Sequence, residues 1–174
     1  MPVPEIPDVV RPVATADYLE VMTRAVFQAG VRWKQIADNW EAYYAAFDGF
    51  DARRIAKYDD LEIERILGTP GILRMRRKVA ATIANARALE AIEREHGNVE
   101  SYLRSFGSYD ELARDVRERF AFMGEMNVWY FLFRVGEPVP RFENWVLTIR
   151  GDHPRMNEMV LQARAQGRSP ERGD

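Results

Sequence analysis

The sequence of 174 residues contains no cysteine and only two histidines. Without cysteine the chain can form no disulfide bond, no thiolate metal site and no cysteine nucleophile. Two histidines are too few for a histidine-rich metal site, and His96 and His153 are interpreted as an ordinary helix-end residue and a loop residue. We therefore expect no zinc and no other cofactor.

Long apolar runs are also absent. The longest notable run, 128–133, has six residues, whereas a membrane-spanning helix needs about 18 or more. Prolines and acidic residues follow Met1, which is unlike the basic and then apolar leader of a secretory signal. The expected location is the cytoplasm, with no membrane association.

The chain has little net charge, because 25 basic residues face 27 acidic ones and give a net charge of −2. This balance argues against a protein that holds nucleic acid through a large overall positive charge. The basic residues are 22 arginines and three lysines, and arginine offers the planar fork that suits phosphate. A GC-rich coding bias is the simpler explanation of this ratio. Whether the chain binds nucleic acid must therefore be judged from the local distribution of its charges.

Strand signals are poor, and helical spacing of apolar residues runs through the chain, which predicts an all-α fold. The expected helices cover residues 16–29, 33–47, 51–57, 59–67, 73–96, 99–105, 109–118, 125–135 and 154–165. Two short apolar runs, 120–122 and 145–149, are the only doubtful places. The expected organisation is an extended proline-rich arm at 1–14, a helical domain at 15–136, an extension packed on it at 137–165 and a flexible tail at 166–174.

A helix hairpin is the most informative local pattern. Residues 59–67 and 72–89 are expected helices, and a four-residue turn, Gly-Thr-Pro-Gly, joins them. Glycine lets backbone N–H groups approach an anion closely, and the start of the second helix adds its own free N–H groups. The predicted phosphate site consists of the amides of Gly71, Ile72 and Leu73 and the side chains of Arg74, Arg76, Arg77 and Lys78. An ordinary hairpin with a solvated basic face is the alternative.

The run from Phe27 to Trp33 reads Phe-Gln-Ala-Gly-Val-Arg-Trp. It resembles the Phe-Gln-Ala-Gly-Leu-Ser-Trp element of the 3-methyladenine DNA glycosylase I family. Further stretches fit the family in the same order, namely 44–47, 50–51, 55–56, 62–67, 71–79, 83–88, 105–106 and 120–124. The resemblance covers roughly residues 18–136 and implies the helix-hairpin-helix DNA glycosylase fold.

The departures from the family are equally specific. Residues 1–17 hold no counterpart of the family's Tyr-His-Asp-x-Glu-Trp-Gly element, and no cysteine is available for the zinc that the family holds with both chain ends. The family's pocket glutamate falls on Ala25, and its late-helix tyrosine and glutamine fall on Trp129 and Phe133. We expect a retained DNA-binding half and a rebuilt base pocket.

The resemblance also implies site residues, because a glycosylase must flip the base out of the stack before acting on it. Val31 occupies the position of the family's wedge leucine, and Arg32 is expected to face phosphate. The predicted base pocket is formed by Trp33, Gln28, Phe27, Trp129 and Phe133. For the last two, packing in the core is the alternative that we favour.

No catalytic residue follows from the resemblance. An alkylated purine is cationic and leaves as a neutral base, so general acid catalysis is less needed. A carboxylate would still stabilise the cationic sugar, and the candidates are Glu125, Asp38 and Glu20. A helix cap or a solvated surface residue is the alternative for each of the three.

Three functions remain open at this point. The first is a DNA base-excision repair glycosylase that hydrolyses the N-glycosidic bond of an alkylated, 3-methyladenine-like purine. The second is a catalytically degenerate relative that binds damaged or distorted DNA, and the third is a protein-interaction module. The expected partner is double-stranded DNA with a damaged base, and the expected state is a monomer.

Overall fold

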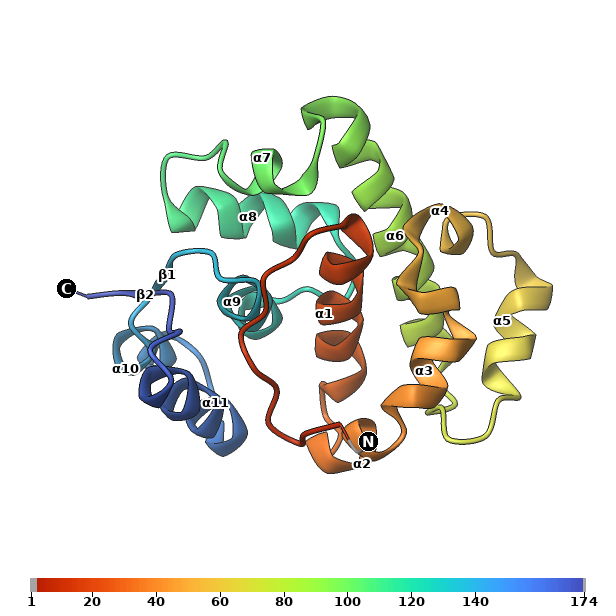
Figure 1. Ribbon diagram of the computed structural model, residues 1–174, viewed down its shortest axis with the longest axis horizontal. Coiled ribbons are helices and arrows are strands. Elements are labelled where there is room, and N and C mark those ends of the chain that lie inside the picture. The colour runs from red at the N-terminus through yellow and green to blue at the C-terminus, as the bar shows by residue number, and fades with distance from the viewer. Residues whose placement is uncertain (1–2, 174) are drawn as a thin grey trace.

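Eleven α-helices and two short 3₁₀ helices provide most of the regular structure in residues 3–173, the part of the chain that the computed structural model describes (Figure 1). The helices before the hairpin turn are α1 (Thr15–Gln28), α2 (Trp33–Asp38), α3 (Trp40–Ala46), η1 (Asp48–Phe50), α4 (Ala52–Ile55) and α5 (Asp60–Leu67). The central and late ones are α6 (Arg76–His96), α7 (Val99–Leu103), α8 (Tyr109–Arg119), α9 (Glu125–Arg134), α10 (Phe142–Trp145), η2 (Val146–Thr148) and α11 (Pro154–Ala165). The prediction of an all-α fold is confirmed.

Several helices begin at side chains that cap their first turn. The Asp59 side chain accepts a hydrogen bond from the Glu62 N–H at the start of α5, and the Ser108 hydroxyl accepts one from the Glu111 N–H at the start of α8. These bonds satisfy N–H groups that have no partner within the helix.

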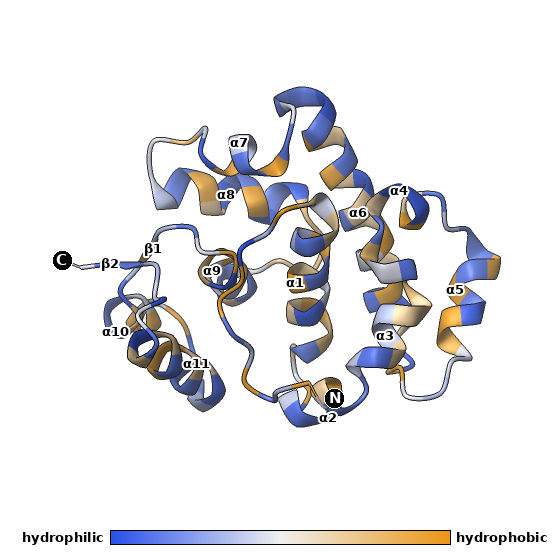
Figure 2. Ribbon diagram, in the orientation of Figure 1, coloured by the Kyte–Doolittle hydropathy of each residue, from blue (hydrophilic) through white to orange (hydrophobic). Residues whose placement is uncertain are grey.

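Helix α1 lies in the middle of the molecule, with α3 and α6 on one side and α9 on the other (Figure 1). Its residues Leu19, Met22 and Val26 are fully buried. Hydrophobic and hydrophilic residues alternate along the surrounding helices (Figure 2). Helix α9 is buried along nearly its whole length, so α1 and α9 form the centre of the core.

Two helix predictions need correction. The helix expected over 33–47 is two helices, because the chain bends at Asn39, whose φ and ψ are −110° and 8°. The helix expected from residue 73 begins at Arg76, because Met75 is extended and the Leu73 N–H donates to the Tyr43 hydroxyl at 2.9 Å. The turn of the hairpin is therefore longer than expected and is bound to α3.

The N-terminal residues 3–13 contain no helix or strand and lie across α1 and α9. The Val10 N–H donates to the Arg134 carbonyl at 2.7 Å, and Arg134 Nε donates to the Asp8 carbonyl at 3.0 Å. Arg24 on α1 donates to the Pro4 carbonyl at 2.7 Å. Residues 1 and 2 of the expected arm and residue 174 of the expected tail lie outside the described residues.

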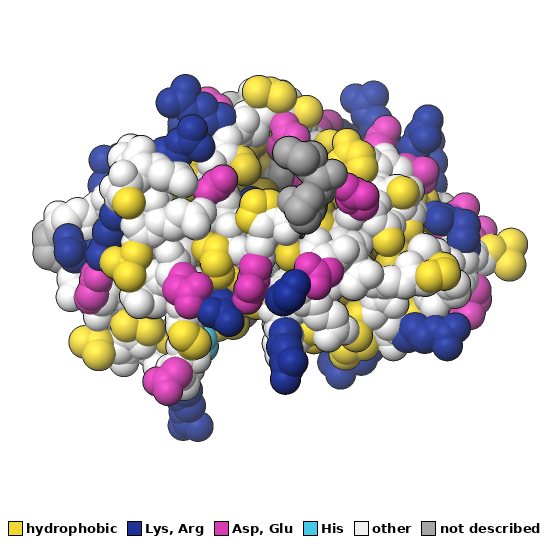
Figure 3. Space-filling model, turned by 60° about the horizontal axis from the view of Figure 1, so that its bottom comes forward, with side chains coloured by type: hydrophobic (Ala, Val, Ile, Leu, Met, Phe, Trp, Pro, Cys, Tyr) yellow, Lys and Arg dark blue, Asp and Glu magenta, His cyan; other side chains and the backbone are white. Residues whose placement is uncertain are grey.

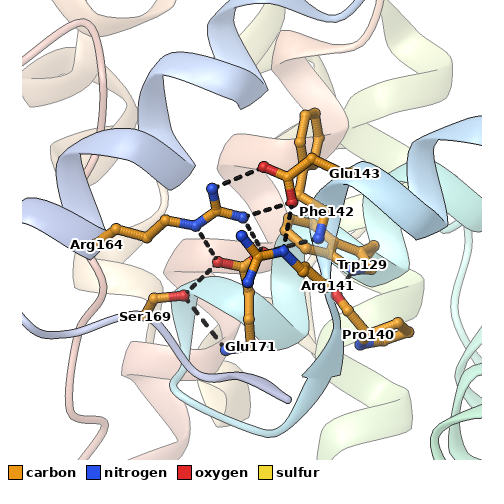
Figure 4. A network of polar contacts seen from close by, with 8 residues as sticks. All are labelled: Trp129, Pro140, Arg141, Phe142, Glu143, Arg164, Ser169 and Glu171. Atoms are coloured by element: carbon orange, nitrogen blue, oxygen red, sulfur yellow. Dashed lines mark hydrogen bonds and ion pairs between the residues drawn. The ribbon is translucent and has the colours of Figure 1, made fainter. Parts of the chain in front are cut away.

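The C-terminal residues 166–173 are not the flexible tail that the sequence predicted. Strand β2 (Glu171–Arg172) pairs in parallel with β1 (Val139–Pro140), and neither doubtful apolar run forms a strand. Figure 4 shows Arg164 between the carboxylates of Glu143 and Glu171, with ion-pair distances of 2.7 Å to each. The tail glutamate Glu171 has only 8% of its side chain exposed, so the ion pair with Arg164 compensates its buried charge.

Candidate active site

A cavity of about 770 Å³ opens between the start of α2 and the start of α11. Figure 3 looks onto this side of the molecule, where a hollow is bordered by Lys and Arg side chains. The cavity is lined by Glu5, Gln28, Gly30, Val31, Arg32, Trp33, Lys34, Met126, Asp152, His153, Pro154, Arg155 and Met156. Its volume lies within the range of small-molecule sites, about 300–1,000 Å³, and accommodates a purine base.

The turn after α1 supplies the aromatic part of the cavity. Trp33 is half-buried and packs at 81° against the buried ring of Tyr130, with 5.7 Å between centroids. Val31 is partly exposed on the same turn, and its N–H donates to the Gln28 carbonyl at 3.0 Å. The sequence predicted Trp33, Gln28 and Val31 for the site, and the structure brings all three to this cavity.

The side chain of Gln28 has a fixed orientation. Arg24 Nε donates to Gln28 Oε1 at 2.9 Å, and both residues are buried. Because the oxygen is engaged with Arg24, the amide Nε2 is the atom left to donate to a ligand. A ring nitrogen or carbonyl of a base is a suitable acceptor for this donor.

Charged residues from the two chain ends complete the cavity wall, and sequence reasoning missed their part in it. Glu5 comes from the N-terminal arm, and Asp152, His153 and Arg155 come from the loop and first turn at α11. Arg155 Nε lies 2.9 Å from Glu5 Oε1. No local signal marks these residues, because they are about 150 positions apart and meet only in the folded chain.

Three predicted pocket residues lie elsewhere. Phe27 is fully buried against Tyr43 and Phe47. Trp129 and Phe133 are also fully buried and stack on each other at 5.0 Å. They face α10 rather than the cavity, because helix α9 turns this side toward the C-terminal extension.

The three candidate carboxylates also lie outside the cavity lining. Glu20 accepts a hydrogen bond from Trp40 Nε1 at 2.9 Å. Asp38 pairs with Lys34 at 3.0 Å, and Glu125 pairs with Arg117 at 3.0 Å. Ala25, at the family's glutamate position, is buried on α1 and does not line the cavity either. These carboxylates therefore have structural partners and do not face a ligand in the cavity.

The predicted phosphate site at the hairpin contains some residues that are engaged within the protein and others that are exposed. Lys78 is buried, and its Nζ donates to the carbonyls of Phe27 at 3.1 Å and Ala29 at 2.7 Å. Burial lowers the pKa of this amine. Lys78 therefore caps the end of α1 and is not available to phosphate.

Among the backbone amides, the Ile72 N–H donates to the Thr69 carbonyl and the Leu73 N–H to Tyr43. Within residues 3–173, no acceptor is found for the N–H groups of Gly71, Arg74, Arg76 and Arg77. Gly71 has a φ of +89°, and a Cβ there would lie 2.8 Å from Asn39 Oδ1, so the turn requires glycine. The free amides thus begin at the predicted glycine but continue into α6.

The predicted arginines are exposed around these amides. Arg74 Nε donates to the Leu67 carbonyl at 3.0 Å, Arg76 pairs with Glu64, and Arg77 lies over the Phe122 ring at 5.6 Å. Arg32 is exposed at the start of α2 and lines the cavity. His96 is at the opposite end of α6, where its ring packs against Tyr102.

The residues present do not fit the zinc that the family resemblance implies. The chain ends meet through the pairs Glu5 with Arg155 and Asp8 with Gln162, in which neither a cysteine nor a histidine takes part. Throughout the described part of the chain, no three His, Cys, Asp or Glu side chains are grouped closely enough to hold a metal ion. No helix there is long and apolar enough to cross a membrane.

The helices around the hairpin and the cavity form an all-α fold of the kind found in 3-methyladenine DNA glycosylase I. A sequence profile of the methyladenine glycosylase family matches residues 11–128, about two thirds of the chain. The chain belongs to the methyladenine glycosylase family.

Individual relatives extend this comparison. A DNA-3-methyladenine glycosylase of Haemophilus influenzae is 34% identical over 89 residues, which are 51% of this chain and 48% of that protein. DNA-3-methyladenine glycosylase 1 of Escherichia coli is 34% identical over 79 residues, 45% of this chain and 42% of that protein. The chain thus spans just under half the length of these curated relatives.

Solved structures match over a longer part of the chain. A crystal structure of 3-methyladenine DNA glycosylase I superposes with a TM-score of 0.60 at 28% identity and covers 73% of this chain and 81% of that one. The enzyme from Staphylococcus aureus, described for its recognition of 3-methyladenine, superposes with a TM-score of 0.64 at 22% identity, over 73% of this chain and 79% of that one. The second likeness concerns the fold alone.

Proposed function

We propose that this protein is a DNA N-glycosylase that releases an alkylated purine of the 3-methyladenine type from double-stranded DNA. The observation that carries the proposal is the base-sized cavity at the turn from Gln28 to Trp33, which holds an aromatic ring and a fixed amide donor. The family match supplies the reaction class, since relatives in the comparison are 3-methyladenine glycosylases.

The hairpin and the cavity are attached to the same pair of helices. Trp33 begins α2, while Asn39 and Tyr43 on the next turns contact Gly71 and the Leu73 N–H. Free amides at the start of a helix bind phosphate, and the exposed arginines add positive charge. A phosphate bound at the hairpin would therefore lie at a fixed distance from a base in the cavity.

The chemistry needs the flipped base to be held and its positively charged sugar to be stabilised. In the proposed complex, the base stacks on Trp33 and accepts a hydrogen bond from Gln28 Nε2. Val31 fills part of the space that the base leaves in the duplex. Because an alkylated purine carries a positive charge, it leaves as a neutral base without a general acid.

The test is release of bases from DNA methylated in bulk, with the products separated by chromatography. Aromatic stacking on a base is worth about 1–3 kcal/mol, so Trp33→Ala should slow release about 10- to 100-fold under single-turnover conditions. Tyr44→Ala is the matched control, since Tyr44 is an exposed aromatic on α3 outside the cavity. Its rate should equal that of the wild type.

Binding of damaged DNA without excision is the second candidate, because Ala25 replaces the family's pocket glutamate. A wild type that releases no base but binds abasic-site duplexes better than intact ones would favour this candidate. The double variant Arg76→Gln, Arg77→Gln separates these two DNA-binding candidates from a protein-interaction module. Only binding through phosphate contacts has a salt dependence that becomes shallower when the two arginines are removed.

A further inference from the structure

Two carboxylates, Glu5 and Asp152, line the cavity that holds Trp33. Both come from chain ends, outside the part of the chain that matches the family profile. Cleavage of an N-glycosidic bond places positive charge on the sugar, and a fixed negative group in a partly enclosed site stabilises that charge. The question is which of the two carboxylates is fixed.

Glu5 is held through its backbone. Arg24 Nη2 donates to the Pro4 carbonyl at 2.7 Å and to the Glu5 carbonyl at 3.4 Å. Arg24 is itself buried, and its Nε is fixed on Gln28. One guanidinium therefore positions both the amide that would donate to a base and the arm that carries Glu5.

Glu5 is also held through its side chain. Its carboxylate pairs with Arg155 Nε at 2.9 Å and has 33% of its side chain exposed. Arg155 Nη1 pairs at the same time with Glu158 at 2.7 Å. One guanidinium between two carboxylates leaves a net charge of −1, so the pairing orients Glu5 without cancelling the negative charge of the group.

Asp152 lacks comparable support. Its side chain is exposed, and no hydrogen bond or ion pair is found for it in residues 3–173. A group that must reorient during the reaction stabilises developing charge less than one already in place. The geometry thus favours Glu5.

We propose that Glu5 is the catalytic carboxylate of this site and contacts the sugar of the bound nucleotide. This inference rests on the proposed glycosylase function. The bond from C1′ to the base nitrogen breaks, and its electron pair goes to the cationic base, which leaves neutral. Glu5 stabilises the positive charge left on the sugar, a water oxygen bonds to C1′, and the proton of that water passes to solvent.

The experiment measures single-turnover release of methylated purines by the full chain carrying Glu5→Gln, Asp152→Asn or Glu125→Gln. Loss of one preorganised electrostatic group typically costs about 10²- to 10³-fold in rate, and we expect a loss of this size for Glu5→Gln alone. Glu125→Gln is the matched control, because Glu125 is also paired with an arginine, Arg117, but does not line the cavity.

Two further measurements exclude a merely structural effect. The thermal midpoint and the affinity for abasic-site DNA should change little in Glu5→Gln, because Arg24 binds backbone carbonyls that glutamine retains and the lost pair with Arg155 is partly exposed. Glu5→Asp, which keeps the charge, should recover part of the lost rate.

The outcomes are distinguishable. If the wild type releases bases and Glu5→Gln is as fast, or if Asp152→Asn loses more rate than Glu5→Gln, the assignment of Glu5 is wrong while the proposed function stands. If the wild type releases no base, the proposed function fails and this inference fails with it.

Discussion

The part of the chain that matches the family and the two chain ends differ in the contacts that hold them in place. Helices α1, α6 and α9 pack through fully buried apolar side chains such as Met22, Leu89 and Val128. The ends also bury apolar residues, Trp145 and Val160 among them, and add directed polar contacts such as Arg134 with the Asp8 carbonyl and Gln162 with the Asp8 carboxylate at 2.6 Å. The first region is a hydrophobic core, and the ends are attached to it by apolar packing together with directed hydrogen bonds.

The two regions also supply different groups to the lining of the cavity. The turn after α1 supplies the aromatic and amide groups, Trp33 and Gln28, whereas the ends supply Glu5, Asp152 and Arg155. Directed polar contacts fix positions and orientations more strictly than apolar packing does. In this protein the groups that would recognise a base thus come from the core region, and the carboxylates of the cavity come from the attached ends.

The largest effect on stability is expected from a substitution in the buried core, away from the cavity. Trp129 is fully buried, stacks on Phe133 and Trp145, and donates its Nε1 hydrogen to the Pro140 carbonyl. Trp129→Ala should lower the free energy of unfolding by about 3–5 kcal/mol, since it leaves a large void. Urea unfolding at 25 °C measures this loss.

The same variant distinguishes core packing from base binding. At a temperature where Trp129→Ala is folded, it should release bases at close to the wild-type rate, whereas Trp33→Ala should be slow but stable. A folded Trp129→Ala protein that has lost base release would show that Trp129 belongs to the pocket after all.

The fold was predictable from the sequence because its signals are local. Caps such as Asp59 and Ser108 and the apolar spacing within α1 fix helix positions without knowledge of the rest of the chain. The break at Asn39 and the late start of α6 were missed, because both depend on contacts between α3 and the hairpin turn.

The site was less predictable than the fold, and only some of its residues leave a signal in the sequence. The role of Lys78 could have been found, since Thr82, Asn85 and Leu89 follow it at helical spacing and all four lie on the buried face of α6. The arrival of Glu5 beside Arg155 could not, because no periodicity relates residues about 150 positions apart.

Lys78 and Arg77 are neighbours on α6, but Lys78 is buried and Arg77 is exposed, so we expect opposite effects of their substitutions. Lys78→Met removes the donor for two carbonyls at the end of α1, and unsatisfied buried acceptors cost about 1–3 kcal/mol. Arg77 is exposed, so Arg77→Gln should leave stability unchanged.

For DNA binding, we expect an effect of Arg77→Gln and none of Lys78→Met, the reverse of their effects on stability. Arg77→Gln should weaken binding to duplex DNA and make its salt dependence shallower by about one unit of slope, as expected for one lost phosphate contact. Lys78→Met, measured well below its unfolding temperature, should retain the wild-type salt slope. Equal salt slopes for the two variants would contradict the assignment of these lysine and arginine side chains.

The smallest expected effect concerns the attached C-terminal end. Hydrogen bonds from Arg164 lower the pKa of the Glu143 carboxyl from 4.5 to about 2. Burial raises the pKa of Glu171, but hydrogen bonds from Arg164, the Phe142 N–H and Ser169 outweigh burial, so this pKa also lies below its ordinary value.

Carboxyl groups with a lowered pKa in the folded state stabilise the protein above their unfolded pKa, and this contribution is lost as the pH falls through the folded value. Wild-type stability should therefore decrease between about pH 4.5 and pH 2, where Glu143 becomes protonated. Arg164→Met should cost about 1 kcal/mol near pH 7, as expected for a partly exposed ion-pair network, and should make this acid dependence shallower. Urea titrations across the pH range measure both quantities, and parallel pH curves for the two proteins would show that Arg164 does not hold the C-terminal end through these carboxylates.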